Sequence, residues 1–237
     1  MKPTGKKNYG SIPHLSSSKL GPGDYFMTPG QERIITEKLR DKHDNVLAFE
    51  KYDGSNVGVA KVGGKIHALT RSGYLASTSP YKQHHLFAVW VARREKMFNA
   101  MLNEGERIAG EWMAQAHGLL YNISGDPIVF FDYFDAQNQR VIYEELGAKA
   151  IQFGIPIPRK LHDGGCVTVA GLLPLLNQKT KGMESVELPE GIVFRVERKG
   201  KVDFLGKWVR PDFIPGIHCI NVNECDLKWN VSPENCK

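Results

Sequence analysis

A short charged stretch, residues 49–56 (FEKYDGSN), holds the first side chains that could do chemistry. It lies between two apolar runs of strand type, residues 46–49 and 57–62, which predicts a junction between two strands. Asp53 and the glycine after it favour a turn, because glycine accepts positive φ and aspartate can bond its own backbone. Lys51 therefore projects from a rigid edge, either as a plain surface lysine of a hairpin or as a reactive amine.

Further along the chain, other polar side chains occupy the ends or interiors of strands that are otherwise apolar. They are Arg71, Glu111, Asp132, Glu190 and Lys207. A carboxylate in an apolar strand is costly unless it forms a salt bridge or coordinates a cation. Carboxylate oxygens, completed by water and phosphate, are the ligands that Mg²⁺ prefers. These positions are therefore where chemistry should be sought, with a buried salt bridge as the plain alternative for Glu111.

Residues 51–54 (KYDG) resemble the Lys-x-Asp-Gly signature of the covalent nucleotidyltransferases. This superfamily includes DNA ligases, RNA ligases and mRNA capping enzymes. In those families the lysine attacks the α-phosphate of a nucleoside triphosphate and carries the nucleotide as a phosphoramidate. The resemblance implies that Lys51 is the nucleophile, and the companion motifs must then follow downstream in the order of the family.

The next two motifs of the family are matched in that order. Residues 71–73 (RSG) resemble the second motif, in which an arginine approaches the ribose or an incoming phosphate. Residues 110–112 (GEW) resemble the Gly-Glu motif, whose glutamate binds the ribose hydroxyls or helps to hold a metal. The resemblance thus assigns nucleotide contacts to Arg71 and Glu111, although an arginine at a strand end is often only solvated.

Two more motifs lie in apolar strands. Residues 130–132 (FFD) resemble the motif whose aromatic ring stacks on the purine, which indicates Phe131, although aromatic runs in strands usually belong to the core. Residues 190–195 (EGIVFR) match the Glu-Gly-hydrophobic-hydrophobic motif, whose glutamate acts through the divalent metal near the α-phosphate. The resemblance therefore implies that Glu190 holds the metal together with Glu111.

The last motif of the family is matched only in part. The family has two lysines one residue apart on the same face of a strand, and both contact the triphosphate. Lys207 supplies one of them. Strand alternation puts Leu205 and Val209 on the face of Lys207, and Arg210 reaches that face only if a bulge intervenes. The second phosphate-contacting cation is therefore unassigned.

Glu50 before the lysine and Asn56 after it indicate which branch of the superfamily the chain resembles. The combination Glu-Lys-x-Asp-Gly-Ser/Thr-Asn looks more like the phage and editing-type RNA ligases than like DNA ligases or capping enzymes. In that family the glutamate lies near the adenine and the asparagine near the phosphate or ribose. The resemblance covers about residues 46–210. It implies an ATP-dependent RNA ligase that uses ATP and Mg²⁺, with Mn²⁺ as a possible substitute.

In this scheme Lys51, Arg71 and Lys207 are the catalytic residues. Nucleophilic attack needs a neutral amine, whereas a free lysine is protonated at neutral pH. We expect nearby positive charge from Arg71, Lys207 and the bound metal to lower the pKa of Lys51. The same charges would stabilise the pentavalent phosphoryl transition state. AMP would then pass to a 5′-phosphate end, and an adjoining 3′-hydroxyl would displace it.

Two other interpretations stay open. A DNA ligase or a capping-type guanylyltransferase shares these motifs, but such enzymes usually carry an oligonucleotide-binding (OB) barrel after the last motif. Residues 211–237 are too few to form one. A nucleic-acid end-binding module could also keep the fold without the chemistry. Retention of the lysine and of two costly glutamates argues against that module.

Composition sets further limits. A chain of 237 residues with ordinary apolar and charged fractions suits a soluble globular protein, and a net charge of +5 favours polyanionic partners. No apolar run approaches a membrane span and the first residues lack a secretory signal, so we expect a cytoplasmic monomer. The cysteines are Cys166, Cys219, Cys225 and Cys236. We expect reduced thiols, with a disulfide or metal clip near the C terminus as the alternative.

The pattern of elements predicts an α+β class with mainly antiparallel sheets flanked by helices. The strand-type runs are 46–49, 57–62, 65–70, 107–113, 128–134, 191–197 and 202–209. The helical patterns cover 31–42, 81–102, 141–150 and 167–178. The glycine pair at 63–64 suits a two-residue hairpin turn.

The resemblance implies that these elements build the ATP-grasp-like adenylyltransferase fold of the nucleotidyltransferases. We expect a leader with a short amphipathic helix over residues 1–45, the nucleotidyltransferase domain over 46–215 and an irregular tail over 216–237. No OB barrel is expected at the C terminus.

Overall fold

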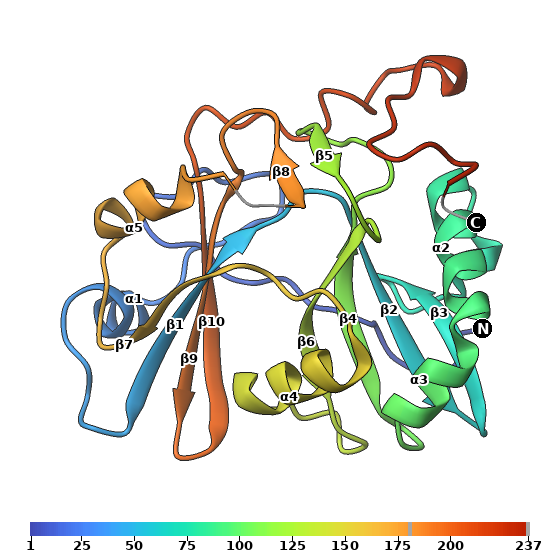
Figure 1. Ribbon diagram of the computed structural model, residues 1–237. Coiled ribbons are helices and arrows are strands. Elements are labelled where there is room, and N and C mark those ends of the chain that lie inside the picture. Colours follow the sequence, from blue (N-terminus) through green and yellow to red (C-terminus); the bar gives the residue numbers. More distant parts are fainter. Residues whose placement is uncertain (180–181, 236–237) are drawn as a thin grey trace.

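The computed structural model describes residues 1–179 and 182–235, and its main feature is a pair of four-stranded sheets lying side by side (Figure 1). The first sheet has the order β10-β9-β1-β7. Its strands are β1 (Asp44–Lys51), β7 (Lys160–Gly164), β9 (Gly191–Arg198) and β10 (Lys201–Val209). All neighbouring strands in this sheet run antiparallel. The arrangement confirms the predicted α+β class.

The second sheet has the order β3-β2-β4-β6 and is also antiparallel. Its strands are β2 (Ser55–Val62), β3 (Lys65–Thr70), β4 (Arg107–Trp112) and β6 (Ile128–Phe134). The predicted two-residue turn joins β2 to β3, with Gly63 and Gly64 at φ of 61° and 70°. A small ribbon pairs β5 (Tyr121–Ile123) with β8 (Met183–Ser185).

Helices cover the outer faces of the two sheets. The second sheet packs against α2 (Lys82–Arg93), α3 (Glu95–Met101) and α4 (Tyr143–Phe153). The large buried side chains of this core are Phe87, Phe98, Trp112 and Phe130. The first sheet packs against α1 (Pro29–Thr36) and α5 (Val169–Leu176). Two short 3₁₀ turns, η1 (Ala76–Thr78) and η2 (Glu224–Asp226), complete the elements.

The predicted single helix over residues 81–102 is wrong, because the structure breaks it at Arg94. This residue leaves the helical region, with φ of −106° and ψ of 17°, and separates α2 from α3. Its guanidinium lies 4.3 Å from the centre of the Trp90 ring and donates a 2.8 Å hydrogen bond to Asp126. The spacing of apolar residues does not indicate the break, because Phe98 after it packs into the same core as Trp90 before it.

Other boundaries also differ from the predictions. The first helix ends at Thr36 instead of residue 42. After it, the backbone N–H and the side chain of Arg40 both donate hydrogen bonds to the Asp44 carboxylate, which holds this segment as a turn. Strands β5, β7 and β8 are not foreseen, since each is short and has little apolar alternation. Pro174 lies within α5 without ending it.

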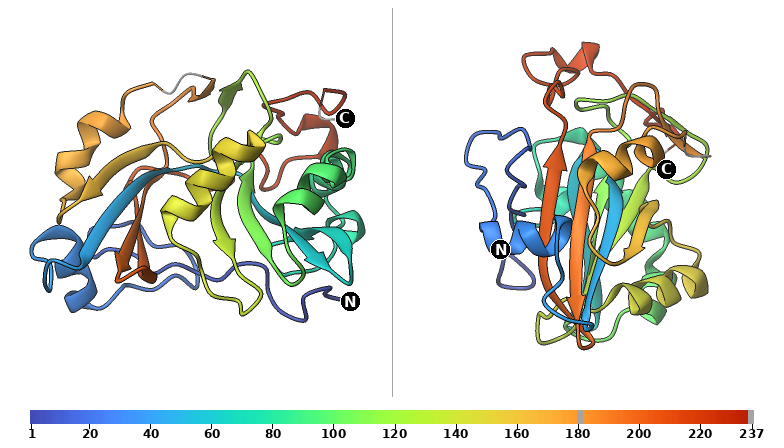
Figure 2. Two further views of the ribbon diagram at one scale, coloured as in Figure 1. Left: turned by 60° about the horizontal axis from the view of Figure 1, so that its bottom comes forward. Right: turned by 90° about the vertical axis from the view of Figure 1, so that its left-hand side faces the viewer.

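The leader crosses from the second sheet to the first (Figure 2). Near β3, the backbone N–H groups of Asn8 and Tyr9 donate to the Arg71 carbonyl oxygen. Further on, Leu15 N–H donates to the Lys207 carbonyl of β10, and Lys207 N–H donates to Pro13. The leader therefore ties the two sheets together on one side of the molecule.

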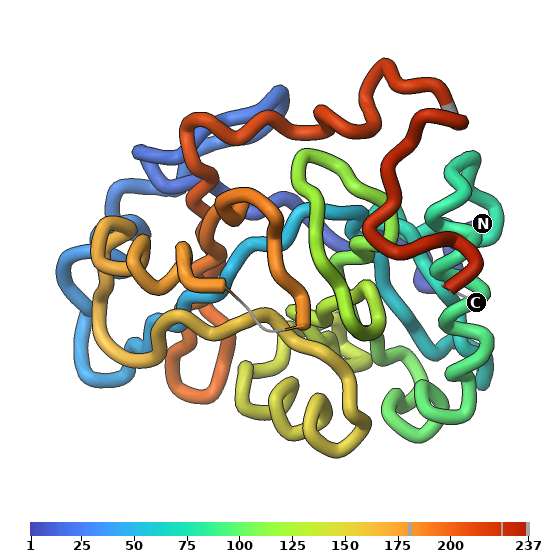
Figure 3. Tube along the Cα trace, turned by 45° about the horizontal axis from the view of Figure 1, so that its top comes forward, coloured from blue at the N-terminus to red at the C-terminus, as the bar shows by residue number. Residues whose placement is uncertain are grey.

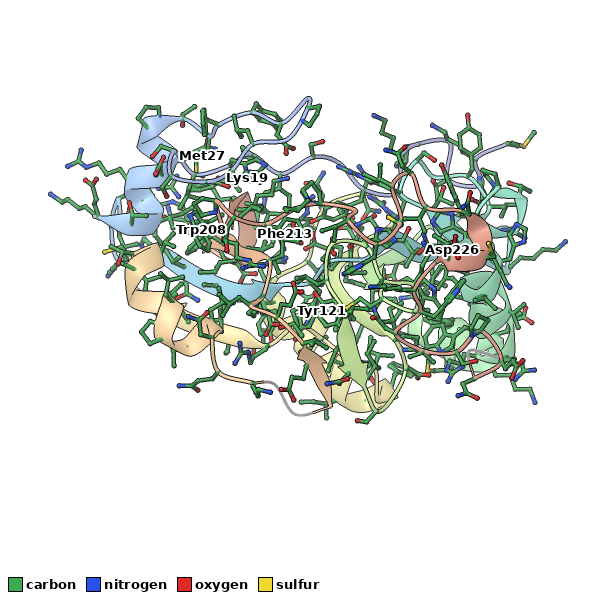
Figure 4. The ribbon with its side chains drawn as sticks, turned by 90° about the horizontal axis from the view of Figure 1, so that it is seen from above. Lys19, Met27, Tyr121, Trp208, Phe213 and Asp226 are labelled. Carbon is green, nitrogen blue, oxygen red and sulfur yellow. The ribbon has the colours of Figure 1, made fainter. Side chains whose placement is uncertain are left out.

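The C-terminal segment makes a second connection between the sheets (Figure 3). After β10 it passes Phe213, whose carbonyl accepts a 2.5 Å hydrogen bond from Lys19 of the leader; the two residues lie next to each other in Figure 4. It then reaches the end of β4, where Asn230 N–H donates to the Ala114 carbonyl. The expected boundaries at residues 45 and 215 stay predictions, and both flanking segments pack on the sheets.

The thiols of Cys166, Cys219 and Cys225 are free, and Cys236, the remaining cysteine of the alternative C-terminal clip, lies outside the described residues. Within residues 1–179 and 182–235, none of the helices has the length and apolar character needed to cross a lipid bilayer.

Candidate active site

The register of the first sheet places Lys51 beside Glu190. Lys51 is the last residue of β1 and pairs with Gly191, the first residue of β9. A Cβ at Gly191 would clash with the Trp208 carbonyl of β10, so only glycine fits there. The Lys51 Nζ donates a 2.5 Å hydrogen bond to Glu190 Oε2, and the two side chains are 22% and 8% exposed. The candidate nucleophile is a mostly buried amine held by a carboxylate.

The second sheet contributes Asn56, Glu111 and Phe131 from three adjacent strands. Asn56 of β2 pairs with Glu111 of β4, and β4 pairs with β6, which carries Phe131. Glu111 accepts a 3.2 Å hydrogen bond from the Gly54 N–H in the turn after β1. The Asn56 Oδ1 atom is buried and has no hydrogen-bond partner within the described part of the chain. It is an acceptor available to a ligand hydroxyl or amine.

A pocket between the two sheets collects most of the predicted site residues. Those that line it are Glu50, Lys51, Asn56, Arg71, Glu111, Phe131 and Lys207. Glu190 does not line this pocket but is hydrogen-bonded to Lys51. Apolar and aromatic side chains make up much of the remaining wall, among them Phe49, Tyr143, Val193 and Leu205. A flat apolar ligand with a charged end fits this combination of walls.

In the metal-free protein, Arg71 and Lys207 do not bring the pKa of Lys51 below its usual value, and the contribution expected from a bound metal stays a prediction. Burial would lower the pKa of the Lys51 ammonium, but the carboxylates of Glu190, Glu111 and Asp53 outweigh burial and raise it above the usual value. The pKa of Lys207, by contrast, is lowered by burial and by the charge of Lys51. The prediction counted cations along the sequence and overlooked the carboxylates that the two sheets bring to the same amine.

Glu111 and Glu190 form the candidate metal site. Burial raises the pKa of Glu111 to about 8 and that of Glu190 to about 7, against the opposing charge of Lys51. Among the described residues, no group of three or more His, Cys, Asp or Glu side chains could hold a metal ion by itself. Mg²⁺ commonly binds through one or two carboxylates and completes its shell with water and substrate phosphate. The two glutamates fit that mode of binding.

Both predicted phosphate-binding cations contact the leader. Arg71 Nη2 donates a 3.3 Å hydrogen bond to Ser11 Oγ. Lys207 Nζ lies 3.3 Å from Asp24 Oδ1, and the buried His14 contacts the other oxygen of Asp24 at 3.0 Å. The leader therefore orients the side chains of both cations, whose contact with phosphate stays a prediction. Arg210 is not part of the pocket lining, and the bulge of β10 lies at residues 202–204, so no bulge brings its side chain to Lys207.

The sequence analysis missed Tyr9, which forms part of the pocket wall. Its ring meets the Phe131 ring edge to face, with 5.1 Å between centroids. Its hydroxyl donates a 2.5 Å hydrogen bond to Asp132, which is 1% exposed and also accepts from Arg140 and Arg195. Asp132 is thus a buried salt-bridge partner that fixes the wall beside Phe131.

The roles of two arginines were also missed: Arg195 lines the pocket, and Arg159 lies next to Glu50 of its lining. Arg195 lies in the apolar strand β9, and the argument that singled out Glu111 as a costly charge applies to it equally. Arg159 Nε donates a 2.9 Å hydrogen bond to Glu50 Oε2, and its other nitrogens donate to the carbonyls of Leu176 and Gln178. Arg159 therefore fixes the orientation of Glu50, whose contact with a base stays a prediction.

The sequence suggested that the Asp53 side chain accepts a hydrogen bond from the backbone of its own turn. In the structure it accepts hydrogen bonds from a loop that is distant in sequence. Its carboxylate accepts hydrogen bonds of 2.6 and 2.9 Å from the N–H groups of Gly118 and Leu119. Its own N–H donates to the Tyr121 hydroxyl at 2.9 Å. The turn that follows Lys51 is thereby attached to the segment that runs from β4 of the second sheet into β5, which helps to keep the amine at the junction of the two sheets.

The raised pKa values predict a pH dependence of stability in metal-free protein. Glu111 and Glu190 bind protons more tightly in the folded chain than in the unfolded chain, where the carboxyl pKa is about 4.3. The free energy of unfolding should therefore fall as pH rises, from about 5 to 7 for Glu190 and from about 5 to 8 for Glu111, by up to ~1.4 kcal/mol per pH unit for each group. Urea denaturation in EDTA measures this slope. The double variant Glu111→Gln/Glu190→Gln should flatten it, and an equal slope in the variant would contradict the assignment.

The sequence model of the RNA ligase family matches residues 44–209 of the chain. No curated protein matches the sequence. Among solved structures, an archaeal ATP-dependent RNA ligase is 18% identical, with a TM-score of 0.50 and 85% of this chain covered. A Naegleria gruberi RNA ligase with PPi is 20% identical, with a TM-score of 0.51 over 71% of this chain. A mutant of the Naegleria enzyme with ATP and Mn is 18% identical, with a TM-score of 0.52 over 76%.

These structural matches show a shared fold, because identity is low in each case. The chain spans about half the length of the proteins that it matches, covering 48% of the archaeal ligase and 50% of the Naegleria ligase with PPi. The third match is covered to 54% of its length.

Proposed function

This chain belongs to the RNA ligase family, and from that membership and the pocket around Lys51 we propose that it is an ATP-dependent ligase joining 3′-hydroxyl and 5′-phosphate ends of RNA. One observation carries the proposal: Lys51 is hydrogen-bonded to Glu190 and lines a pocket with Glu111, Phe131 and Lys207. A monomer acting in the cytoplasm is part of the proposal.

In the first step the neutral amine of Lys51 attacks the α-phosphorus of ATP. A bond forms between Nζ and phosphorus, the bond from that phosphorus to the bridging oxygen breaks, and pyrophosphate leaves. Lys51 must lose a proton first, because Glu190 and Glu111 favour its ammonium form. A divalent cation bound by these two carboxylates would cancel their charge and stabilise the charge that develops on the α-phosphate.

Burial then favours the reactive form of Lys51. Burial acts to lower the pKa of the amine, whereas Glu190, Glu111 and Asp53 raise it, so neutralising the two glutamates makes the amine easier to deprotonate. A cation bound by the two glutamates would thus remove the interaction with Glu190 that favours the charged form of Lys51.

The pocket walls account for the other parts of the nucleotide. Phe131 offers an aromatic face for the purine, and Val193 lies on the wall contributed by the first sheet. Asn56 Oδ1 offers a buried acceptor, and Glu111 beside it suits a ribose hydroxyl. Lys207 supplies a cation for the phosphates. Arg71, at the exposed rim, suits either the nucleotide or the incoming 5′-phosphate.

The remaining steps pass AMP to the nucleic acid and then release it. An oxygen of the 5′-phosphate end attacks the phosphorus of the lysyl-AMP, the phosphorus–nitrogen bond breaks and Lys51 regains its amine. The 3′-hydroxyl of the neighbouring end then attacks the phosphorus of the 5′-phosphate. A phosphodiester bond forms, the bond to AMP breaks, and AMP leaves with the electron pair of that bond.

The proposal is tested by incubating the protein with Mg²⁺ and each of the four nucleoside triphosphates labelled at the α-phosphate. Label should become covalently attached from ATP, and a chase with nicked RNA duplexes or single-stranded RNA should move it to a 5′ end and then release it as AMP. Parallel DNA substrates establish the preferred strand. Absence of protein-bound label with every nucleotide would refute the covalent step, and labelling from GTP alone would indicate a capping-type enzyme.

A further inference from the structure

The N-terminal residues form a basic surface beside the pocket. Residues 1–23 contain Lys2, Lys6, Lys7 and Lys19 and no carboxylate. Lys6 and Lys7 are exposed. Among the described residues, no carboxylate forms an ion pair with Lys2, Lys6 or Lys7. Their positive charge is therefore not neutralised within the described chain.

Backbone contacts attach this surface to the rim of the pocket. Asn8 and Tyr9 donate hydrogen bonds of 3.1 and 3.2 Å to the carbonyl of Arg71, which lines the pocket. Gly73, at φ of 88°, packs directly on the Lys6 carbonyl, and a Cβ there would clash with it. The two lysines before Asn8 are therefore held next to Arg71 by the fold.

An exposed aromatic ring extends the same surface. Tyr74 follows Gly73 and is 48% exposed. The Lys2 Nζ lies 5.0 Å from the centre of its ring. We call Lys2, Lys6, Lys7, Arg71 and Tyr74 together the basic strip. Proteins that bind single strands combine cations for the phosphate backbone with aromatic rings on which bases stack, and the strip offers both.

We propose that the basic strip binds the phosphodiester backbone of the strand whose 5′-phosphate enters the pocket. This inference rests on the proposed ligase function. The nucleotide occupies the pocket itself. Arg71 of the strip lines the pocket at its rim, whereas the other four residues of the strip are not part of the lining. The terminal phosphate meets Arg71, the following phosphates meet Lys7 and Lys6, and a base stacks on Tyr74.

Binding of a nicked RNA duplex with a 5′-phosphate and a fluorescent label, measured by anisotropy in EDTA at several salt concentrations, tests the proposal. The variant Lys6→Ala/Lys7→Ala should bind about tenfold more weakly at low salt. It should also reduce the slope of log K against log salt by about 1.4–1.8, since each phosphate contact accounts for ~0.7–0.9. Tyr74→Ala should weaken binding with little change in slope, because stacking releases no counterions.

The matched control is Lys38→Ala/Lys42→Ala. These two exposed lysines precede Asp44, the start of β1, and so lie at the opposite end of that strand from Lys51. This control should bind like the wild type. An unchanged affinity and slope in Lys6→Ala/Lys7→Ala would overturn the proposal, as would an equal loss in both pairs.

Labelling from ATP separates this proposal from the ligase function. The Lys6→Ala/Lys7→Ala protein should label its own Lys51 at the wild-type rate, which also shows that the variant is folded. If the wild type itself takes no label, the ligase function fails. If the wild type labels and the strip variant binds the duplex normally, only the strip proposal fails.

Discussion

Replacing Lys51 with alanine should reduce covalent labelling from ATP by roughly 10³-fold or more, because removal of a nucleophile eliminates the covalent path and leaves only background reaction. Lys51→Arg should be equally inactive. It keeps a positive charge beside Glu190, but a guanidinium stays protonated at neutral pH and cannot attack. Comparison of the two variants therefore shows whether labelling depends on the positive charge at position 51 or on the nucleophilic amine. Gel autoradiography measures the label, and mass spectrometry of the labelled peptide identifies the modified residue.

Lys160 provides the control for this experiment. It forms a comparable ion pair, 2.6 Å from Asp163, but lies on β7 and does not line the pocket. Lys160→Ala should label normally. Label that persists in Lys51→Ala, or that maps to another lysine in the wild type, would show that the nucleophile lies elsewhere.

Replacing Asp132 with alanine should lower the free energy of unfolding by about 3–5 kcal/mol, which is the usual cost of removing one partner from a buried ion pair. Asp132 is almost fully buried and accepts hydrogen bonds from Tyr9, Arg140 and Arg195. The side chain of Arg195 is only 3% exposed and would lose a buried partner at 2.5 Å. Urea denaturation followed by tryptophan fluorescence measures the loss.

Asp163→Ala is the comparison for Asp132→Ala. Its carboxylate is 43% exposed and pairs with Lys160 at the surface, so its removal should cost less than ~1 kcal/mol. A loss of under about 1 kcal/mol for Asp132→Ala as well would mean that Arg195 finds compensation in its other bonds, to Glu197 and the Val141 carbonyl.

The sequence could predict those parts of the fold in which apolar and polar residues repeat with the spacing of a strand or a helix. Strands such as β2 and β3, with the Gly63–Gly64 turn between them, follow from alternation and turn chemistry. The break at Arg94 could not be foreseen, because α2 and α3 present their apolar residues to one core and the period continues across the break. Strand β7 has too little alternation to be recognised, although it completes the first sheet.

The residues of the candidate site also fall into those that the sequence could identify and those that it could not. Its polar residues were recognisable because a charge within an apolar strand, such as Glu111, or directly before one, such as Glu190, is out of place, and the structure brings both close to Lys51. Their roles stay predictions. Tyr9 and Asp24 were not recognisable, because they reach the site through a segment without a period. The raised pKa of Lys51 in the metal-free protein was not foreseen, since it depends on which carboxylates the two sheets place around the amine.

The hydrogen bonds between the leader and β10 have a consequence for self-association. Strand β10 is the outermost strand of its sheet, and without the leader its outward N–H and C=O groups would stand open. Pro13, Leu15 and Lys19 pair with those groups at Lys207 and Val209 as another strand would. An open strand edge is a template on which separate molecules join and aggregate. The leader therefore also covers the edge of β10 and prevents the sheets of two protein molecules from pairing there.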